Sequence, residues 1–401
     1  MATSILLVLL SLFTASLFFV LIPGLGAFIV RAKWRRFRSI MLDISTFPLL
    51  HYGAVTEDSQ GLPFRFFGSL EAIQDRNRVW IRSGDLSVAA DLENVPVYIL
   101  PSVSRTEDFT EALADEEPQS IPWRQISSLP AGVPIFAAGS LFLESGRPIL
   151  RSQGREPLLV VIYDGERESI LRRAIWCGRQ RNEYWNQFTI ISLITGSFAL
   201  LFLSYLFLGD PGTRVPALVS LSLSITPLLV LLPPGVIFLL LYRRFWRLAR
   251  SLRAQRDLQR LPLRYFRLPG SGAGAARLPN GERYVMLHGR REEMESRISE
   301  DARGRVLFDR PRFTSSEDEV YLFGALVESG DSPQPAVAHP TVGHPADPMA
   351  ELILTQGNPE INAQRCSRRS KIFTLLSGLF LSLDVVPNLF LAFMVLRAIL
   401  P

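Results

Sequence analysis

The sequence has few of the residues that build metal centres and nucleophilic sites. It contains two cysteines, Cys177 and Cys366, and four histidines in 401 residues. No CxxC pair is present, so neither a zinc ribbon nor a dithiol redox motif can be assembled. HExxH, GxSxG and Walker motifs are also missing. We therefore expect a protein that is not an enzyme and that carries no metal and no cofactor.

Charged side chains are nearly missing from four long stretches, 5–30, 188–208, 217–242 and 372–400. Each stretch is long enough to cross a hydrocarbon core of about 30 Å. No positive charge precedes the first stretch and its apolar run is long, which argues against a cleaved signal peptide. The sequence therefore predicts four transmembrane helices.

Basic residues gather at one set of span ends. Twenty Arg and Lys residues lie there, against only Arg214 and Arg397 at the opposite ends. Positive residues beside spans remain in the cytoplasm. We expect a bacterial inner-membrane protein with both termini periplasmic and with segments 31–187 and 243–371 cytoplasmic. Lipid headgroups, rather than nucleic acid, explain the basic charge, and the residues expected to face them are Arg35, Arg36, Arg243, Arg244, Arg368 and Arg369.

Short phrases recur in the same order in the two halves of the chain. The Pro-Gly of "LIPGLGAFIVRAKWRRF" (21–37) returns in "LPPGVIFLLLYRRFWRL" (232–248), and "IFAAGSLFLESG" (135–146) matches "YLFGALVESG" (321–330). Three further matches keep this order: "LPFRFF" with "LPLRYF", "PLLVVIYDG" with "PMAELILTQG", and "CGRQR" with "CSRRSK". Five matches in register predict a tandem duplication of a unit made of span, domain and span.

The two large segments between spans carry strand signals. Runs such as "NRVWIRSG" and "PLLVVIY" are rich in branched and aromatic residues and are bounded by Gly, Asn, Asp or Pro. Residues 166–187 have the pattern of a helix that leads into the second span. The predicted fold class is an α+β integral membrane protein with four transmembrane helices and two β-rich cytoplasmic domains.

Three polar segments allow more than one interpretation. The acidic stretch 107–117 is typical of a solvated segment, with a cation site as the alternative. The Gly-rich stretch 268–282 is a flexible linker, because no phosphate-loop motif is present. The Pro-rich stretch 331–348 is also flexible. It holds His339 and His344, with Asp347 nearby, so a metal site is conceivable but lacks a rigid scaffold.

The two cysteines lie at matching places in the repeat, each among arginines. Nearby cations favour the thiolate. A redox or palmitoylation role for Cys177 and Cys366 therefore stays open beside the simpler explanation, inheritance from one duplicated unit.

Polar and helix-breaking residues inside the spans are the remaining candidates. Proline removes a helical hydrogen bond and kinks the helix. Asp384 lies about 18 Å along the last span, where an ionised carboxylate costs about 2.5–3.5 kcal/mol, so it should face protein or water. It serves either as a structural helper of a kinked span or as part of a pathway. The candidates are Asp384, Pro387, Asn388, Pro23, Pro233 and Pro234.

Residues 129–197 contain the pattern LPxGxP, then GxLxL, a turn, a short strand and a helix that enters a span. This pattern resembles the GIDE-type, or beside-a-membrane, domain of the mitochondrial membrane-anchored ubiquitin ligase family and its prokaryotic relatives. The resemblance implies a domain held between two spans. Ligase activity in that family belongs to a zinc-binding RING, which two distant cysteines cannot supply. In that family the domain faces the intermembrane space, whereas the arginines here indicate the cytoplasm.

These observations favour a non-enzymatic multi-pass protein. Its duplicated cytoplasmic domains would bind a protein partner or organise a membrane complex, and the chain could form an oligomer. The alternative is a transporter or channel subunit that uses its bent spans and Asp384. The bilayer is the other expected partner.

Overall fold

The structure is a computed structural model that describes residues 2–74, 77–93, 95–100, 119–126, 129–154, 157–180, 184–230, 235–267, 274–309, 319–327 and 340–399. The acidic stretch 107–117, Pro233, Pro234, His339 and parts of the two flexible stretches, 268–273 and 331–339, lie outside these residues. The chain divides into two compact units. We call them the helical unit (Met1–Arg36, Arg181–Leu252 and Arg368–Pro401) and the β unit (Phe37–Gln180 and Arg253–Ser367). The class is α+β, as expected.

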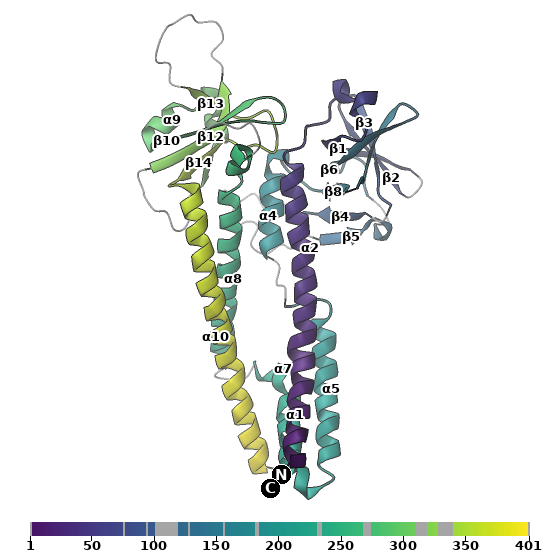
Figure 1. The fold of residues 1–401 in the computed structure, drawn as a ribbon, viewed down its shortest axis with the longest axis vertical. Coiled ribbons are helices and arrows are strands. Elements are labelled where there is room, and N and C mark those ends of the chain that lie inside the picture. Colours follow the sequence, from purple (N-terminus) through teal and green to yellow (C-terminus); the bar gives the residue numbers. More distant parts are fainter. Residues whose placement is uncertain are drawn as a thin grey trace, which may run out of the picture. The chain divides into compact units, whose positions relative to one another are not determined.

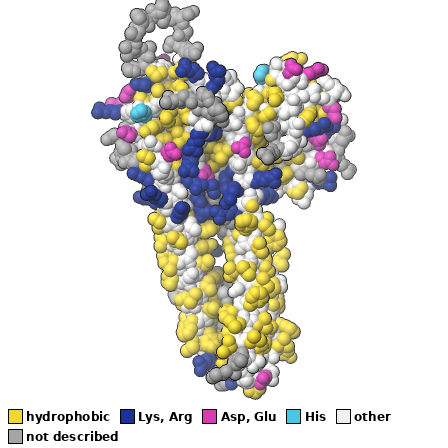
Figure 2. Space-filling view, viewed as in Figure 1, with side chains coloured by type: hydrophobic (Ala, Val, Ile, Leu, Met, Phe, Trp, Pro, Cys, Tyr) yellow, Lys and Arg dark blue, Asp and Glu magenta, His cyan; other side chains and the backbone are white. Residues whose placement is uncertain are grey.

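Within the described residues, three helices are long and apolar enough to cross a membrane. They are Thr3–Ile44, α5 (Thr189–Phe207) and α10 (Pro359–Ile399). The first is continuous through α1 (Ala2–Ser16), a π-helical turn η1 (Leu17–Leu21) and α2 (Ile22–Ile44). Their apolar side chains form most of the yellow surface in Figure 2. The protein is therefore a membrane protein.

The segment predicted as the third span, 217–242, is not one continuous helix. It is divided into α6 (Arg214–Ser224), the single turn α7 (Thr226–Leu229) and α8 (Gly235–Gln259). α6 is about 16 Å long, and the apolar first part of α8 is about 12 Å long. Neither piece alone crosses a core of about 30 Å. Pro227 lies at the start of α7, where its missing N–H cannot continue the α6 hydrogen-bond ladder.

Two sets of contacts hold the helical unit together. α6 folds back on α5, with serine hydroxyls donating to carbonyls of the partner helix: Ser204 Oγ to Ala217 O at 2.9 Å and Ser220 Oγ to Leu200 O at 2.8 Å. Such close, small-residue packing is typical of membrane helices. α8 lies along α10 (Figure 1), where Phe245 stacks on Phe373 and Phe380.

The first β domain has eight strands: β1 (Pro63–Gln74), β2 (Arg78–Ser83), β3 (Leu86–Asp91), β4 (Pro96–Ile99), β5 (Gln119–Pro122), β6 (Pro134–Glu144), β7 (Arg147–Arg151) and β8 (Leu159–Ile162). β6 pairs antiparallel with β1, β7 and β8. β2 and β3 continue from β1, and β3 pairs in parallel with β7. The strands β1, β2, β3, β7 and β6 thus form a closed ring around an apolar core. Helix α4 (Ile170–Gln180) follows β8.

The second β domain has six strands: β9 (Ala275–Arg277), β10 (Arg283–Arg290), β11 (Leu307–Asp309), β12 (Glu319–Val327), β13 (Thr341–Gly343) and β14 (Ile353–Gln356). Helix α9 (Arg291–Ser296) follows β10. β12 pairs antiparallel with β10, β13 and β14, and β11 runs parallel to β14. Met294 of α9 is fully buried in the core of this domain.

The two β domains share a set of strand pairings in the same chain order. In the first, β6 pairs with β1, β7 and β8, and β4 runs parallel to β8. In the second, β12 pairs with β10, β13 and β14, and β11 runs parallel to β14. Ile298 forms a parallel bridge to β13, as β3 does to β7. α9 follows β10 where the first domain continues into β2.

Equivalent glycines lie in the two central strands. A Cβ on Gly139 of β6 would lie 2.9 Å from Arg151 O and 3.0 Å from Leu158 Cδ1. A Cβ on Gly324 of β12 would lie 2.6 Å from Leu352 Cδ1 and would also overlap Val342. Both strands therefore need glycine at this position, because the chain that follows each strand packs too closely for a side chain.

One of the five sequence matches does not survive in the structure. "LPFRFF" begins β1, whereas "LPLRYF" lies in the 3₁₀ helix η7 (Pro262–Arg267). The strand that pairs as β1 does is β10, since Phe64 faces Gly139 and Val285 faces Gly324. The similarity of the two hexapeptides misled because a six-residue apolar phrase does not specify its own secondary structure.

Candidate functional site

Asp384 and Asn388 form a polar pair inside the helical unit. They lie one turn apart on α10, so both side chains are on the same helix face. Asp384 is fully buried and Asn388 is 4 % exposed. Asn388 Nδ2 donates to Leu229 O, the last residue of α7, at 3.0 Å. The pair therefore lies at the interruption between α7 and α8.

Gly235, the first residue of α8, packs directly against this pair. A Cβ at this position would overlap both Asp384 Oδ1 and Asn388 Nδ2. The glycine of the phrase "LPPG" thus lets two polar side chains approach the α8 backbone closely. Pro233 and Pro234 lie outside the described residues.

Neither carboxylate oxygen of Asp384 has a hydrogen-bond partner among the described residues. A buried carboxylate without partners is costly in an apolar medium, so such a group marks a functional candidate or an N-terminal helix cap. The Asp384 side chain is surrounded by protein atoms. This placement is expected, because an ionised carboxylate that faces lipid costs free energy. Pro387, by contrast, is exposed, and α10 continues through it without interruption.

Pro23 lies within a continuous helix. The helix does not end at Pro23 but forms the π-helical turn η1 just before it. Proline cannot donate to the carbonyl four residues earlier, Phe19 O. Tyr184 Oη donates to Phe19 O at 2.9 Å, and Ser192 Oγ donates to Phe18 O at 2.5 Å. Side chains from the neighbouring segment thus take the place of the lost donors.

The expected headgroup-facing residues lie at one end of the apolar helices. Arg35, Arg36, Arg243, Arg244, Arg368 and Arg369 are all exposed. Figure 2 shows dark blue side chains gathered at the end of the yellow surface. An exposed basic cluster at the end of apolar helices is suited to anionic headgroups.

A buried ion pair joins the two β domains within the β unit. Arg65 of β1 and Asp347, which follows β13, each expose about 1 % of the side chain and form a direct hydrogen-bonded contact. Phe64 and Phe66 point into the core of the first domain, so the alternation of a strand sends Arg65 to the outer face. Asp347, considered as a metal ligand above, serves as the counter-ion of Arg65.

Helix α4 forms two ion pairs with segments that lie far away along the chain in the same unit. Arg172 Nε lies 2.6 Å from Glu351 Oε1, and Arg179 Nη2 lies 2.6 Å from Asp257 Oδ2. Burial raises the pKa of Glu351 above its ordinary value of 4.5, while Arg172 opposes this shift. Trp176 of α4 packs on Ala254 and Leu258 of α8.

Tyr284 and Arg264 form further hydrogen bonds in this buried region. Tyr284 Oη donates to Glu351 O at 2.8 Å, and Arg264 Nη2 donates to Met349 O at 2.7 Å. Burial raises the pKa of Tyr284 well above 10.0, so its phenol stays protonated and serves as a donor. Arg65, Asp347, Glu351 and Tyr284 were not recognised as a group from the sequence, although an arginine inside the apolar strand "FRFF" was a usable signal.

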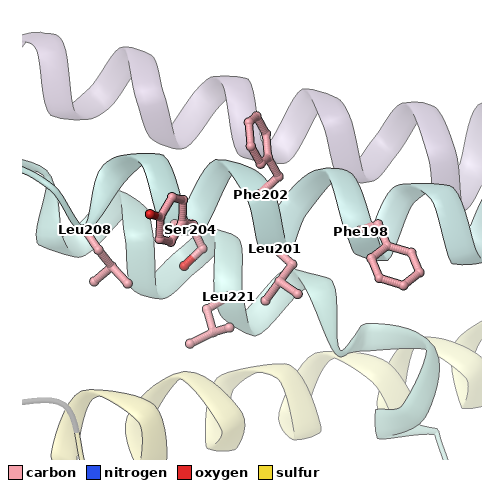
Figure 3. A pocket seen from close by; sticks show the side chains of 7 residues that line it. Phe198, Leu201, Phe202, Ser204, Leu208 and Leu221 are labelled. Atoms are coloured by element: carbon pink, nitrogen blue, oxygen red, sulfur yellow. The ribbon is translucent and has the colours of Figure 1, made fainter.

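A groove of about 480 Å³ runs along α5 and α6 (Figure 3). Its lining is almost wholly apolar, and the Ser204 hydroxyl in it already donates to Ala217 O. Apart from the Tyr205 hydroxyl, the lining has no further polar side chain to orient a polar ligand, so the groove is not suited to a reaction site. Its lining residues are Phe198, Leu201, Phe202, Ser204, Tyr205, Leu208 and Leu221.

The other chemical candidates are not brought together. No group of three or more His, Cys, Asp or Glu side chains that could hold a metal occurs in the described ranges. His344 Nδ1 contacts Pro345 O at 2.8 Å, and Asp347 pairs with Arg65. Cys366 is fully buried in α10; the side chain of Cys177 lies outside the described part.

No family model, curated protein or solved structure matches the chain.

Proposed function

We propose that the chain is a non-enzymatic, multi-pass inner-membrane protein whose two β domains together bind a protein partner, or organise a membrane complex, at the cytoplasmic face. The observation that carries this proposal is the joining of the two domains by the buried pair Arg65–Asp347, with Arg172–Glu351 beside it. Breaking a buried pair is strongly destabilising. The domains therefore offer one composite surface rather than two independent modules.

We also propose that the two halves, 62–187 and 261–371, arose by tandem duplication. The support is the shared set of pairings around β6 and β12, together with the glycines Gly139 and Gly324. A glycine with positive φ also follows the last strand of each domain, Gly165 at 74° and Gly357 at 72°, before the next helix begins. In this account α9 replaces the β2–β3 hairpin of the first copy.

The proposed orientation rests on the basic residues at one end of the helical unit. Positive residues stay in the cytoplasm, which places the β domains there and both termini in the periplasm. Reporters fused after Ser120 and after Arg303 are expected to give a cytoplasmic signal, and one fused after Gly212 a periplasmic signal. A periplasmic signal after Ser120 or Arg303 would reverse the orientation.

The resemblance to the GIDE-type domain supports a binding role beside the membrane. It applies to residues 129–197, which include β6, β7, β8 and α4 and lead into α5. It supplies no catalytic residue, because the RING of the ligase family has no counterpart in a chain with two distant cysteines.

The docking proposal is tested by purifying the full chain in mild detergent after crosslinking in cells. We expect one protein to be recovered in stoichiometric amount with the wild type. It should be lost with Asp347→Ala, which separates the two domains, and kept with Glu295→Ala, which breaks the exposed pair Arg291–Glu295. Recovery of no stoichiometric protein, or equal recovery with Asp347→Ala, would contradict the composite surface.

A second candidate function is transport, and one observation favours it. The third predicted span is interrupted beside the buried pair Asp384 and Asn388. Discontinuous helices with polar groups near the midplane form the ion and substrate sites of many transporters. Flux assays on the full chain in liposomes, with and without Asp384→Asn, distinguish this function from docking.

A further inference from the structure

Asp384 is isolated from other charges along its helix. Lys371 and Arg397, the nearest basic residues of α10, are each thirteen positions away, or about 20 Å along the helix axis. On the packed elements, the titratable side chains are Tyr205 near the end of α5, Arg214 at the start of α6, and Tyr242 with the arginines after it on α8. Tyr242 lies seven positions after Gly235, or about 10 Å along the helix axis. No described side chain is hydrogen-bonded to the carboxylate. Asp384 is therefore the only acidic or basic residue in segments 5–30, 188–208, 217–241 and 372–396.

The two polar residues of α10, Asn388 and Asp384, lie beside the end of α7 and the first described residue of α8. The carbonyl end of α7 receives a donor, because Asn388 Nδ2 bonds Leu229 O. The Asp384 carboxyl lies beside Gly235, the first described residue of α8, although no hydrogen bond joins the two residues. A negative charge at a helix N-terminus is favourable, while a neutral carboxyl loses most of that attraction. The charge of Asp384 therefore sets how strongly α10 holds the first turn of α8.

The available ligands favour a proton over a metal cation. A metal ion needs four or more donor atoms around it, and Asp384 is the one carboxylate here, with no cluster of three potential ligands in the described residues. A proton needs one oxygen, and both Asp384 oxygens are unoccupied by hydrogen bonds there. Ionisable residues inside membrane segments mark ion pathways and proton relays.

We propose that Asp384 is a reversible proton-binding site in the membrane part of the protein, and that its protonation loosens the first turn of α8 from α10. This site is independent of the docking function proposed above. Binding adds one proton to the carboxylate and forms a neutral carboxylic acid, without any other bond change.

The test uses the full chain in liposomes. Infrared difference spectra between alkaline and acidic buffer should show a protonated-carboxyl band that is absent from Asp384→Asn and present in Asp210→Asn. Asp210 is a suitable control because its exposed carboxylate lies in the turn before α6, where it accepts from Gly212 N. A band that is unchanged in Asp384→Asn overturns the proposal.

Hydrogen exchange gives the second readout, after correction for the intrinsic effect of pH on exchange. Acidification should lower the protection of the first turn of α8 by about two- to fivefold in the wild type. Asp384→Asn should show the low protection at every pH, and Asp210→Asn should follow the wild type. If Na⁺ alone, at constant pH, produces the change in the wild type and acidification does not, the site is a metal-cation site and the proposal is wrong.

If Asp384→Asn does not fold, Asp384→Glu is used in its place. This variant keeps a carboxyl group and moves it by the length of one methylene. The protonated-carboxyl band is then expected to move relative to the wild type. A band at an unchanged position would show that another carboxyl produces it, which overturns the assignment.

Discussion

Replacing Asp347 with alanine removes the counter-charge of an arginine that has almost no access to water. Arg65 exposes about 1 % of its side chain, and its Nε and Nη1 atoms already have no hydrogen-bond partner among the described residues. Breaking a buried pair from one side costs about 3–5 kcal/mol, because the remaining charge is left unpaired. A domain of this size loses about 2–4 °C of Tm per kcal/mol. We therefore expect Asp347→Ala to lower the Tm of the β unit by about 6–20 °C.

The measurement is thermal unfolding of the full chain in detergent, followed by proteolysis with mass-spectrometric mapping of cleavage sites in the β unit. Two controls separate charge from packing. Arg65→Met combined with Asp347→Leu replaces the pair by apolar side chains and should recover most of the Tm. Glu295→Ala breaks a pair with side chains 49 % and 46 % exposed, which is worth at most about 1 kcal/mol. An Asp347→Ala variant as stable as Glu295→Ala would refute the reasoning.

Three more variants test other parts of the fold by unfolding or proteolysis. Gly324→Ala should cost about 1–3 kcal/mol through overpacking, while Gly304→Ala, with nothing within 4 Å of its Cβ, should be neutral. Tyr184→Phe should cost about 1–3 kcal/mol by leaving a carbonyl unpaired, and less in a Pro23→Ala background, where a backbone donor returns; equal costs would contradict this. Burial raises the pKa of Glu351, so its contribution to stability is complete below pH 4.5 and is lost as pH rises through the folded pKa. Glu351→Gln should remove that pH dependence, and an unchanged profile would contradict it.

The β-rich character of the two domains was predictable from local patterns. Runs of branched and aromatic residues bounded by turn residues gave β1, β2, β6 and β8 close to their observed positions. The pairing partners were not predictable, because strands that pair lie far apart in sequence. β4 and β8 are parallel neighbours separated by some sixty residues, and no periodicity specifies such a pairing.

The third span is the part of the sequence-based prediction that the described residues do not confirm. Hydropathy treats 217–242 as one apolar run and does not register that Pro227 and Ser224 fall where α6 ends. Length and hydropathy establish that a segment is apolar enough for the bilayer. They do not establish that its backbone is continuous, since a neighbouring helix can satisfy the freed groups.

Some of the buried polar residues could be predicted from the sequence, and others could not. Asp384 was found from the sequence because a carboxylate in an apolar run is conspicuous. The contacts of Arg65, Asp347 and Glu351 were not found, because charged residues are common between predicted spans and only Arg65, inside the apolar "FRFF", was conspicuous. Only the fold brings residues 282 positions apart into one ion pair.

The proposed duplication gives a common origin to two different solutions of one backbone problem. In the first copy Pro23 lies within a continuous helix, and the carbonyls of Phe18 and Phe19 obtain donors from Ser192 and Tyr184, at the start of the following span. In the second copy the chain is helical on both sides of 231–234, and the following span α10 again supplies the polar groups, now Asn388 and Asp384. In both copies the span that leaves the β domain compensates the defect in the span that enters it. Hydroxyl donors are enough where the helix continues. Where α7 ends, a carbonyl is left without its helical donor. Asn388 supplies that donor to Leu229 O, and the Asp384 carboxyl lies beside Gly235 without a hydrogen bond to any described residue.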